Sequence, residues 1–280
     1  MKNSPSTPVP GEGALSPLIP GKLLTIGQGP LLVSIAPAAG GRIAQIKHND
    51  IDWLVGHDSD NAAMIAWGCY PMLPWAGRIR HGRFEFEGRT YHLPTNFAGH
   101  AIHGVGFALP WQVEAQSSAH VELSLRLPNN QDWPFGGRAR QRIGVVGNSL
   151  RMELSVLAGQ HAMPVVFGWH PWFRKPECVD FKPSSFYPRD AEGIATLPLT
   201  APPPPPWDDC FINREPVIVR RAGQQLRLTS NCDHWVVYDE PAHATCVEPQ
   251  SGPPDAFNLG SRKYLAPHTC DTAWFLMEWL

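Results

Sequence analysis

The sequence predicts an all-β protein, a large antiparallel β-sandwich. Short apolar runs alternate with turn signals along most of the chain, and its 30 prolines and 25 glycines supply many turns. No window of a dozen residues holds an apolar stripe of helical period without a glycine or proline break. Many short strands, evenly spread, are typical of a sandwich or a barrel.

The strand candidates begin at residue 23 and continue to the C-terminus. At residues 83–93, two alternating runs flank Glu87-Gly88, which predicts a β-hairpin. The apolar runs lie at residues 23–27, 31–37, 42–46, 51–56, 83–93, 111–115, 120–127, 140–146, 150–158, 163–170, 216–221, 225–230, 234–239, 244–249 and 272–280.

The same pattern predicts the domain organisation. Residues 1–20 are rich in serine, proline and glycine, and we expect a flexible N-terminal tail there. Residues 21–280 are expected to form one β-domain, because no internal repeat or shift in composition divides them. The five prolines Pro202–Pro206 favour polyproline II and predict a stiff connection that leads into Trp207.

The composition excludes several classes of partner. A net charge of −2 gives no basic surface for nucleic acid, and no polybasic stretch suits an anionic membrane. No run of 18 apolar residues occurs, and the N-terminal residues lack the apolar core of a secretory signal, so we expect a cytoplasmic protein. The six scattered cysteines fit free buried thiols at least as well as disulfides.

Polar residues stand out in two segments near the middle of the first half. Arg78 follows two prolines in an apolar setting, and its five fixed donors suit sugar hydroxyls or a structural ion pair. His100 and His103 have the spacing H-x-x-H, but residues i and i+3 of a strand point to opposite faces. We therefore predict no metal site here: one histidine faces a pocket and the other faces packing or solvent.

Two further residues stand where apolar strands end. His170 lies between Trp169 and Trp172, and histidine, with an ordinary pKa near 6.5, donates or accepts a proton near neutrality. Glu248 precedes a proline, and a glutamate of ordinary pKa near 4.3 is ionised and ready to accept a proton. Taken singly, each equally fits a structural histidine and a solvated carboxylate.

Together these segments resemble the aldose 1-epimerase (galactose mutarotase) family, from about Leu31 to Leu280. LPWAGRIRHGRFEFEGRTYHL resembles the block P-x-x-N-R-I-x-x-G-x-F-x-x-x-G-x-x-Y-x-L, and HAIHG resembles the L-H-G block. VVFGWHPWF is similar to the strand that ends in H-P-Y-F, and CVEPQSGPPDAFN to E-x-Q-x-x-P-D-A-x-N. The resemblance implies the galactose mutarotase-like supersandwich.

The resemblance also implies a reaction without a metal or other cofactor. His170 corresponds to the general acid that protonates the ring oxygen of a hexose, and Glu248 to the general base that takes the proton from O1. The ring then opens, rotates about C1–C2 and closes on the other face. The implied partner is a small sugar, and a monomer and a homodimer both stay open.

Three substrate contacts follow from the same motifs. Arg78 and His103 correspond to residues that stabilise charge at the ring oxygen. WDDCF places Asp208 at the family's sugar-binding aspartate, with Asp209 as the adjacent alternative. Gly77 stands where asparagine is common, so one possible hydroxyl contact is missing and the preferred sugar stays open.

Two alternatives remain. A hexose-6-phosphate 1-epimerase needs a phosphate clamp, and Arg138, Arg140 and Arg142 alternate so that they share one strand face. Against this, HGVGFALPW lacks the arginine that the phosphosugar branch shows after its H-G-F block. A non-catalytic carbohydrate-binding protein on the same fold is the other alternative, since fold does not fix function.

Overall fold

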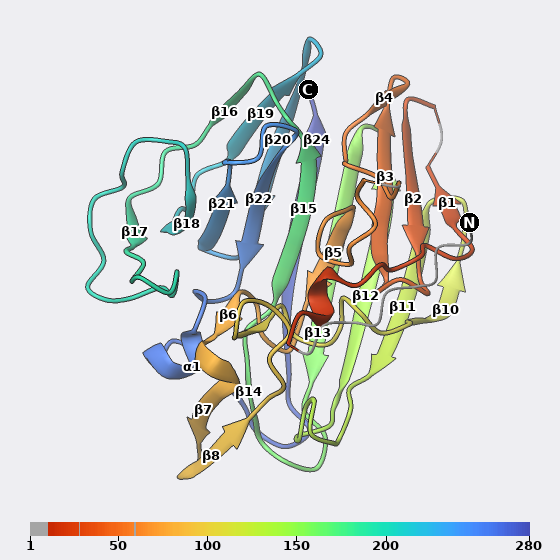
Figure 1. Cartoon of the computed structure of the whole chain (residues 1–280). Coiled ribbons are helices and arrows are strands. Elements are labelled where there is room, and N and C mark those ends of the chain that lie inside the picture. Colours follow the sequence, from red (N-terminus) through yellow and green to blue (C-terminus); the bar gives the residue numbers. More distant parts are fainter. Residues whose placement is uncertain (1–10, 28, 59) are drawn as a thin grey trace, which may run out of the picture.

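Two large antiparallel sheets stack against each other in the computed structural model of the chain, which describes residues 11–27, 29–58 and 60–280 (Figure 1). The prediction of an all-β sandwich is confirmed. The ten-stranded sheet runs in the order β1-β2-β3-β5-β15-β22-β21-β18-β17, with β4 paired to β3. Its strands are β1 (Leu24–Ile26), β2 (Leu31–Ala36), β3 (Arg42–His48), β4 (Ile51–Asp52), β5 (Cys69–Met72), β15 (Gly168–Arg174), β17 (Ser185–Tyr187), β18 (Asp208–Ile212), β21 (His234–Tyr238) and β22 (Ala244–Gln250).

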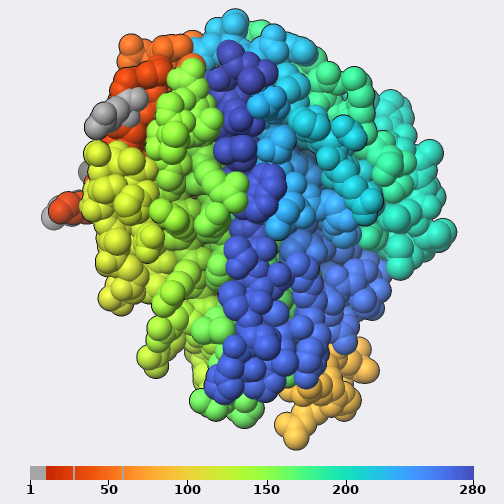
Figure 2. Space-filling view, turned by 180° about the vertical axis from the view of Figure 1, so that it is seen from behind, coloured from red at the N-terminus to blue at the C-terminus, as the bar shows by residue number. Residues whose placement is uncertain are grey.

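The eight-stranded sheet runs in the order β10-β11-β12-β13-β24-β20-β19-β16. Figure 2 shows this sheet from behind, with the C-terminal strand β24 in dark blue beside the green β13, to which it pairs from Cys270 to Glu278. The strands are β10 (Gln112–Gln116), β11 (His120–Arg126), β12 (Arg138–Val146), β13 (Ser149–Leu157), β16 (Cys178–Asp180), β19 (Val217–Arg221), β20 (Gln224–Ser230) and β24 (Cys270–Trp279).

Short elements flank the sheets. Three two-stranded pairs are β6–β9, β7–β8 and β14–β23, and the helices are single turns. Their bounds are β6 (Arg78–Ile79), β7 (Arg83–Phe86), β8 (Arg89–His92), β9 (Ala101–Ile102), β14 (Met163–Val165), β23 (Lys263–Leu265), α1 (Ala256–Leu259), and the 3-10 turns η1 (Gly13–Leu15) and η2 (Arg80–Gly82). The predicted hairpin is confirmed: Glu87 and Gly88 join β7 to β8 with φ of 48° and 72°, as a primed turn requires.

Strand alternation decides which side chains reach the space between the sheets. Trp169 and Phe173 of β15 are fully buried there, and the Trp169 ring lies 5.9 Å from that of Phe275 in β24. His170 and Trp172 therefore point to the opposite face of the ten-stranded sheet. Both are buried as well, because connecting segments cover that face.

The predicted tail divides into two parts. Residues 1–10 lie outside the described residues. Ala14 is fully buried and donates its N–H to Asn96 O at 3.0 Å, and Leu18 donates to Ala62 O at 2.9 Å. The expectation of a flexible tail up to residue 20 is therefore corrected for residues 13–18, which pack on the folded body.

The structure also bears on the cysteines and on membrane-spanning helices. All six cysteines are unpaired; Cys178 and Cys270 are exposed and the other four are buried. Among the described residues, no helix has the length and apolar character needed to cross a membrane.

Candidate active site

A cavity of about 330 Å³ opens on the face of the ten-stranded sheet that points away from the eight-stranded sheet. Its size is that of a small-molecule pocket. All five site residues expected from the sequence line it, although they come from five separate stretches of the chain: Arg78, His103, His170, Asp208 and Glu248.

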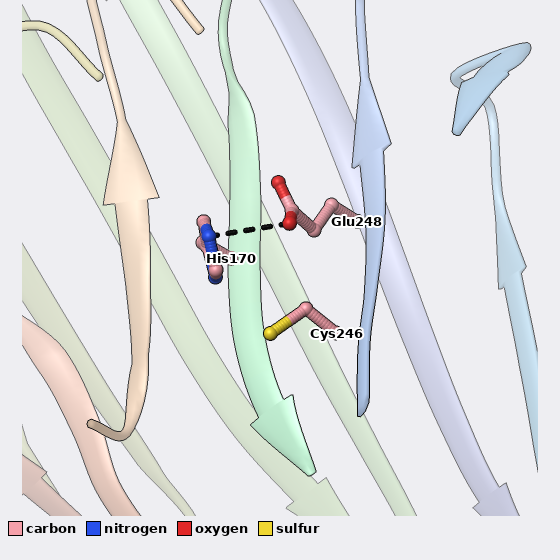
Figure 3. Close-up of side chains that lie close together, drawn as sticks. All are labelled: His170, Cys246 and Glu248. Carbon is pink, nitrogen blue, oxygen red and sulfur yellow. Dashed lines mark ion pairs between the residues drawn. The ribbon is translucent and has the colours of Figure 1, made fainter. Parts of the chain in front are cut away.

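Sheet register brings the predicted acid and base together. Gly168 pairs with Gln250 and Trp172 with Cys246, so His170 of β15 lies opposite Glu248 of β22 on the same face. The His170 Nε2 atom is 3.2 Å from Glu248 Oε1 (Figure 3).

Two aromatic rings hold the imidazole of His170. Tyr70, its partner in β5, stacks on one side with ring centroids 4.7 Å apart and planes at 27°. Trp172, two residues along the strand, stacks at 5.4 Å and 17°. These contacts fix the plane of the ring, so that its Nε2 edge points at the carboxylate.

Burial sets the charges of this pair. Desolvation raises the pKa of Glu248 well above its usual range, and the nearby Asp208 raises it further, although a hydrogen bond from Gln250 Nε2 at 3.2 Å opposes the shift. Desolvation lowers the pKa of His170 to about 3. Both shifts therefore oppose the ionised glutamate and protonated histidine expected from reference values, because burial favours a neutral carboxyl beside a neutral imidazole.

The neighbouring loops supply Arg78 and His103. Arg78 in β6 pairs with Ile102 in β9, so the next residue, His103, lies beside it. The His103 ring meets that of His170 edge-on at 5.0 Å, and burial lowers the pKa of His103 well below its usual range. His100, in contrast, accepts the N–H of His81 at its Nδ1. The expectation that only one of the two histidines faces a pocket is confirmed.

Alternation also separates the two aspartates. Asp208 begins β18 and pairs with Tyr238, which in turn pairs with Cys246 on the face of Glu248. Asp208 therefore lies on the cavity face and Asp209 follows on the other face, although both border the cavity. Arg189 bridges them, since it pairs with Asp208 and its Nε lies 3.3 Å from Asp209 Oδ1.

A buried arginine, Arg42, lies against Tyr70, the ring on which His170 stacks. Arg42 is fully buried, and its guanidinium donates to the carbonyls of Ala39, Met64, Trp67 and Phe107 at 2.7–3.0 Å. It lies 5.0 Å from the centroid of Tyr70. Desolvation lowers its pKa to about 9. Arg42 thereby joins the loops under the cavity to the ring on which His170 stacks.

One group of side chains has the types that a metal ion would need. The ligand atoms of His170, Cys246 and Glu248 lie within 4.8 Å of one another (Figure 3). A metal requires the thiolate, and burial raises the pKa of Cys246 well above its usual range, with the charge of Glu248 adding to the effect. The donor set therefore fits a proton-sharing pair better than a metal, and the absence of a metal cofactor stays a prediction.

Four residues that line the site or contact its side chains were not predicted from the sequence. Tyr70 lies in a strand that contains a proline, Trp172 is indistinguishable from a core aromatic, and Arg189 lies in a segment without regular pattern. Gln250 had a signal: it stands two residues after Glu248, on the same face of one strand.

Known proteins resemble this chain along most of its length. The family model described as aldose 1-epimerase matches residues 22–252. The uncharacterized protein YphB of Escherichia coli (strain K12) is 33% identical over 109 residues, 38% of this chain and 36% of that protein. YihR of the same organism, also uncharacterized, is 25% identical over 157 residues, 54% of this chain and 50% of that protein. The chain thus matches half or less of the length of each relative.

Solved structures share the fold. A galactose mutarotase-like protein from Clostridium acetobutylicum superposes with a TM-score of 0.82 at 17% identity, covering 92% of this chain and 95% of that one. Galactose 1-epimerase from Lactobacillus acidophilus NCFM gives a TM-score of 0.78 at 15% identity, covering 92% and 94%. At these identities the likeness establishes the supersandwich architecture alone.

Proposed function

Because this chain belongs to the aldose 1-epimerase family, we propose that it interconverts the α and β anomers of a free hexose by acid–base ring opening. The observation that carries the proposal is the pair of His170 and Glu248, whose Nε2 and Oε1 atoms lie 3.2 Å apart in the cavity. The two oxygens of a hemiacetal share one carbon, so an acid and a base that act on them must lie side by side.

Each group has a distinct role in the proposed reaction. Glu248 takes the proton from O1 while His170 donates one to the ring oxygen, and the C1–ring oxygen bond breaks to leave an open-chain aldehyde. After rotation about C1–C2, the same two groups act in reverse and close the ring. Arg78 and His103, which border the cavity beside His170, stabilise the negative charge that develops on the ring oxygen.

The proton needed for this reaction is already within the pair. Burial favours a neutral carboxyl and a neutral imidazole, whereas the reaction starts from the carboxylate and the imidazolium, and each of these two states carries one proton. Hydroxyl groups of a bound sugar replace solvent around the carboxylate, and the positive charge of Arg78 lowers the pKa of Glu248. We expect both effects to favour transfer to His170.

The position of the candidate phosphate clamp favours the unphosphorylated sugar. Arg138, Arg140 and Arg142 do share one face of β12, but they are exposed on the eight-stranded sheet and do not border the cavity. Glucose is therefore expected to react faster than glucose 6-phosphate.

Polarimetry of freshly dissolved α-glucose and α-galactose tests the proposal. The wild-type protein should accelerate mutarotation, and His170→Ala or Glu248→Gln should each lower kcat by about 10²–10⁴-fold, the range for a positioned acid or base. Dialysis against EDTA should leave the rate unchanged.

The matched controls are His120→Ala and Glu122→Gln, on β11 of the other sheet, which should retain the wild-type rate. Full activity in both site variants would exclude this mechanism. Sugar binding without any acceleration by the wild-type protein would instead favour the carbohydrate-binding alternative.

A further inference from the structure

One segment contributes a wall of the cavity that no motif predicted. The connection between β17 and β18 brings Arg189, Gly193 and Ala195 to the cavity. Arg189 is the charged residue of this wall, and its side chain is 30% exposed.

Arg189 is only partly engaged by the protein. Its Nη1 donates to Asp208 Oδ2, and its Nε lies 3.3 Å from Asp209 Oδ1. The hydrogen bonds and ion pairs found among the described residues leave Nη2 without a partner. A guanidinium has five N–H donors, so those of Nη2 remain available to a ligand that also touches Asp208.

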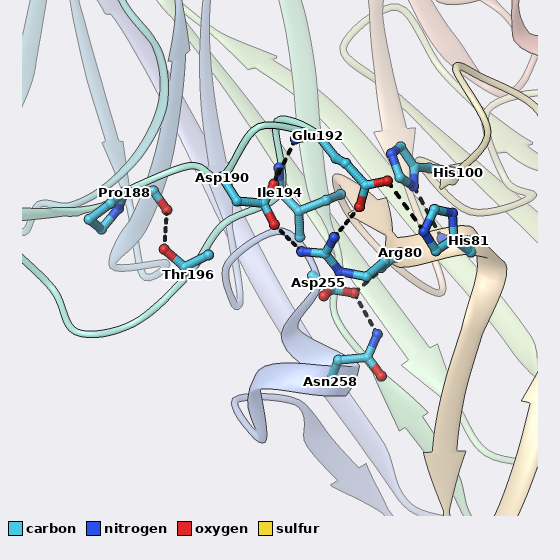
Figure 4. A network of polar contacts seen from close by, with 10 residues as sticks. All are labelled: Arg80, His81, His100, Pro188, Asp190, Glu192, Ile194, Thr196, Asp255 and Asn258. Carbon is cyan, nitrogen blue, oxygen red and sulfur yellow. Dashed lines mark hydrogen bonds and ion pairs between the residues drawn. The ribbon is translucent and has the colours of Figure 1, made fainter.

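The segment around Arg189 is held in place before any ligand binds (Figure 4). Asp190 Oδ1 accepts the N–H groups of Glu192 and Ile194 at 3.0 and 3.1 Å. The Arg80 guanidinium pairs with both Asp190 and Glu192. Because the turn is closed on itself and fastened to η2, Arg189 forms a fixed wall rather than a mobile loop.

We propose that Arg189 is a further binding residue of this site: beside Asp208, which the family resemblance already implies as a sugar contact, it binds the same sugar hydroxyl, remote from the anomeric carbon, and makes the cavity selective for uncharged aldoses. This inference rests on the proposed function. The hydroxyl donates its hydrogen to the Asp208 carboxylate and accepts an N–H from Arg189 Nη2. Adjacent strands lie about 4.8 Å apart, so β18 is roughly 10 Å from β22. We therefore expect the hydroxyl to be on C3 or C4, away from the anomeric carbon held by Glu248.

The charged side chains around the cavity account for the proposed selectivity for uncharged aldoses. Arg189 lies between the carboxylates of Asp208 and Asp209. The other charged side chains that border the cavity are Arg78, Glu240 and Glu248, so acidic groups outnumber basic ones there. A neutral hydroxyl satisfies this group, whereas a phosphate ester brings additional negative charge that the group repels. The cluster thus selects against phosphosugars by its own charge, independently of where the exposed arginines of β12 lie.

Deoxy sugars locate the hydroxyl. 3-Deoxyglucose and 4-deoxyglucose mutarotate through the same ring opening at C1, so the KM of each, compared with that of glucose, tests the contact made at the missing hydroxyl. With the wild-type protein, one of the two should show a KM about 10-fold or more above that of glucose, the value of one charge-assisted hydrogen bond. Arg189→Met should raise the KM for glucose by a similar factor, change kcat little, and abolish the penalty of the deoxy sugar. Arg189→Lys should restore part of the binding.

The matched control is Arg214→Met, which removes the surface pair with Asp233 and should leave both constants unchanged. Because Arg189→Met leaves two carboxylates side by side, the double variant Arg189→Met/Asp209→Asn checks that repulsion alone does not cause the loss. A wild-type KM in Arg189→Met, or a deoxy penalty that persists there, overturns the inference.

Calorimetric titration of the same sugars keeps the two proposals separable. If the wild-type protein binds glucose without accelerating mutarotation, the proposed function fails while the role of Arg189 is still measured. Glucose 6-phosphate should bind at least about 10-fold more weakly than glucose, and Asp209→Asn should narrow that gap. Equal binding of the two sugars by the wild-type protein would refute the charge selection.

Discussion

Gly77 sets the course of the backbone into Arg78. Its φ is 66°, and a Cβ atom there would lie 2.7 Å from the Cβ and 2.9 Å from the Cα of Pro254. Its carbonyl accepts the N–H of His103 at 3.0 Å. In this chain Pro254 occupies the space that a side chain at Gly77 would need, and the close approach aligns Arg78 with His103.

Replacing Gly77 should impair both stability and the site. Gly77→Ala adds the cost of a left-handed conformation, about 1 kcal/mol, and a clash with Pro254 of similar or larger size. Thermal unfolding should therefore begin at a lower temperature, and kcat/KM should fall because Arg78 moves. Gly88→Ala is the matched control, since Gly88 has φ of 72° but open space around it. Equal effects of the two substitutions would show that Pro254 imposes no constraint.

Sequence reasoning at this scale named candidate residues where a motif surrounded them. His170, Glu248, Arg78 and His103 were expected in a common site, and all border one cavity. It failed for their ionisation, because reference pKa values contain no information about burial. It also missed Arg189, since a contact made to Asp208 from a separate segment leaves no periodic signal.

At the scale of elements, the sequence indicated the regular strands and the runs that lead into β15 and β22, which carry His170 and Glu248, but not β5 or β18. β12, β13 and β24 alternate buried and exposed residues over nine or ten positions, which a period of two reveals. β5 is buried at every position and contains Pro71, so it shows neither alternation nor a clean apolar run. β18 begins with two aspartates. Functional strands break the pattern because they place polar or ring side chains where a core residue would lie.

The segment at residues 13–18 was expected to be loose but forms part of the cavity wall. Leu15 borders the cavity, and the segment is held mainly by a few backbone hydrogen bonds and by the fully buried Ala14.

Ala14→Glu should detach this segment, because burying an unpaired charge costs several kcal/mol and these few contacts contribute less. KM should rise several-fold while the sheets stay folded, as far-UV circular dichroism will report. Ile19→Glu, a matched change at a side chain 75% exposed, should have no effect; an unchanged KM in Ala14→Glu would exclude the wall.

At the scale of the whole molecule, the site is a set of titratable groups buried in an apolar body. His103 and His170 are 7% and 6% exposed and Glu248 is 2% exposed, and burial favours the uncharged form of each. Unfolding releases all three to their ordinary pKa values. The free energy of unfolding must therefore depend on pH, and the pair and the single histidine contribute differently to that dependence.

The proton count predicts how stability changes between pH 4.5 and 6.5. There the unfolded pair binds one proton, on His170. The raised pKa of Glu248 favours one proton on the folded pair as well, so we expect the pair to contribute little slope. His103, with its lowered pKa, gives stability that is present above pH 6.5 and is lost as pH falls, by roughly 1 kcal/mol per pH unit. Measured by urea denaturation across this range, His103→Gln should lose that slope, Glu248→Gln should gain a second one from His170, and surface His120→Gln should match the wild type. A wild-type slope in Glu248→Gln would mean that His170 and Glu248 do not share a single proton, and the starting state assigned to the reaction would have to be abandoned.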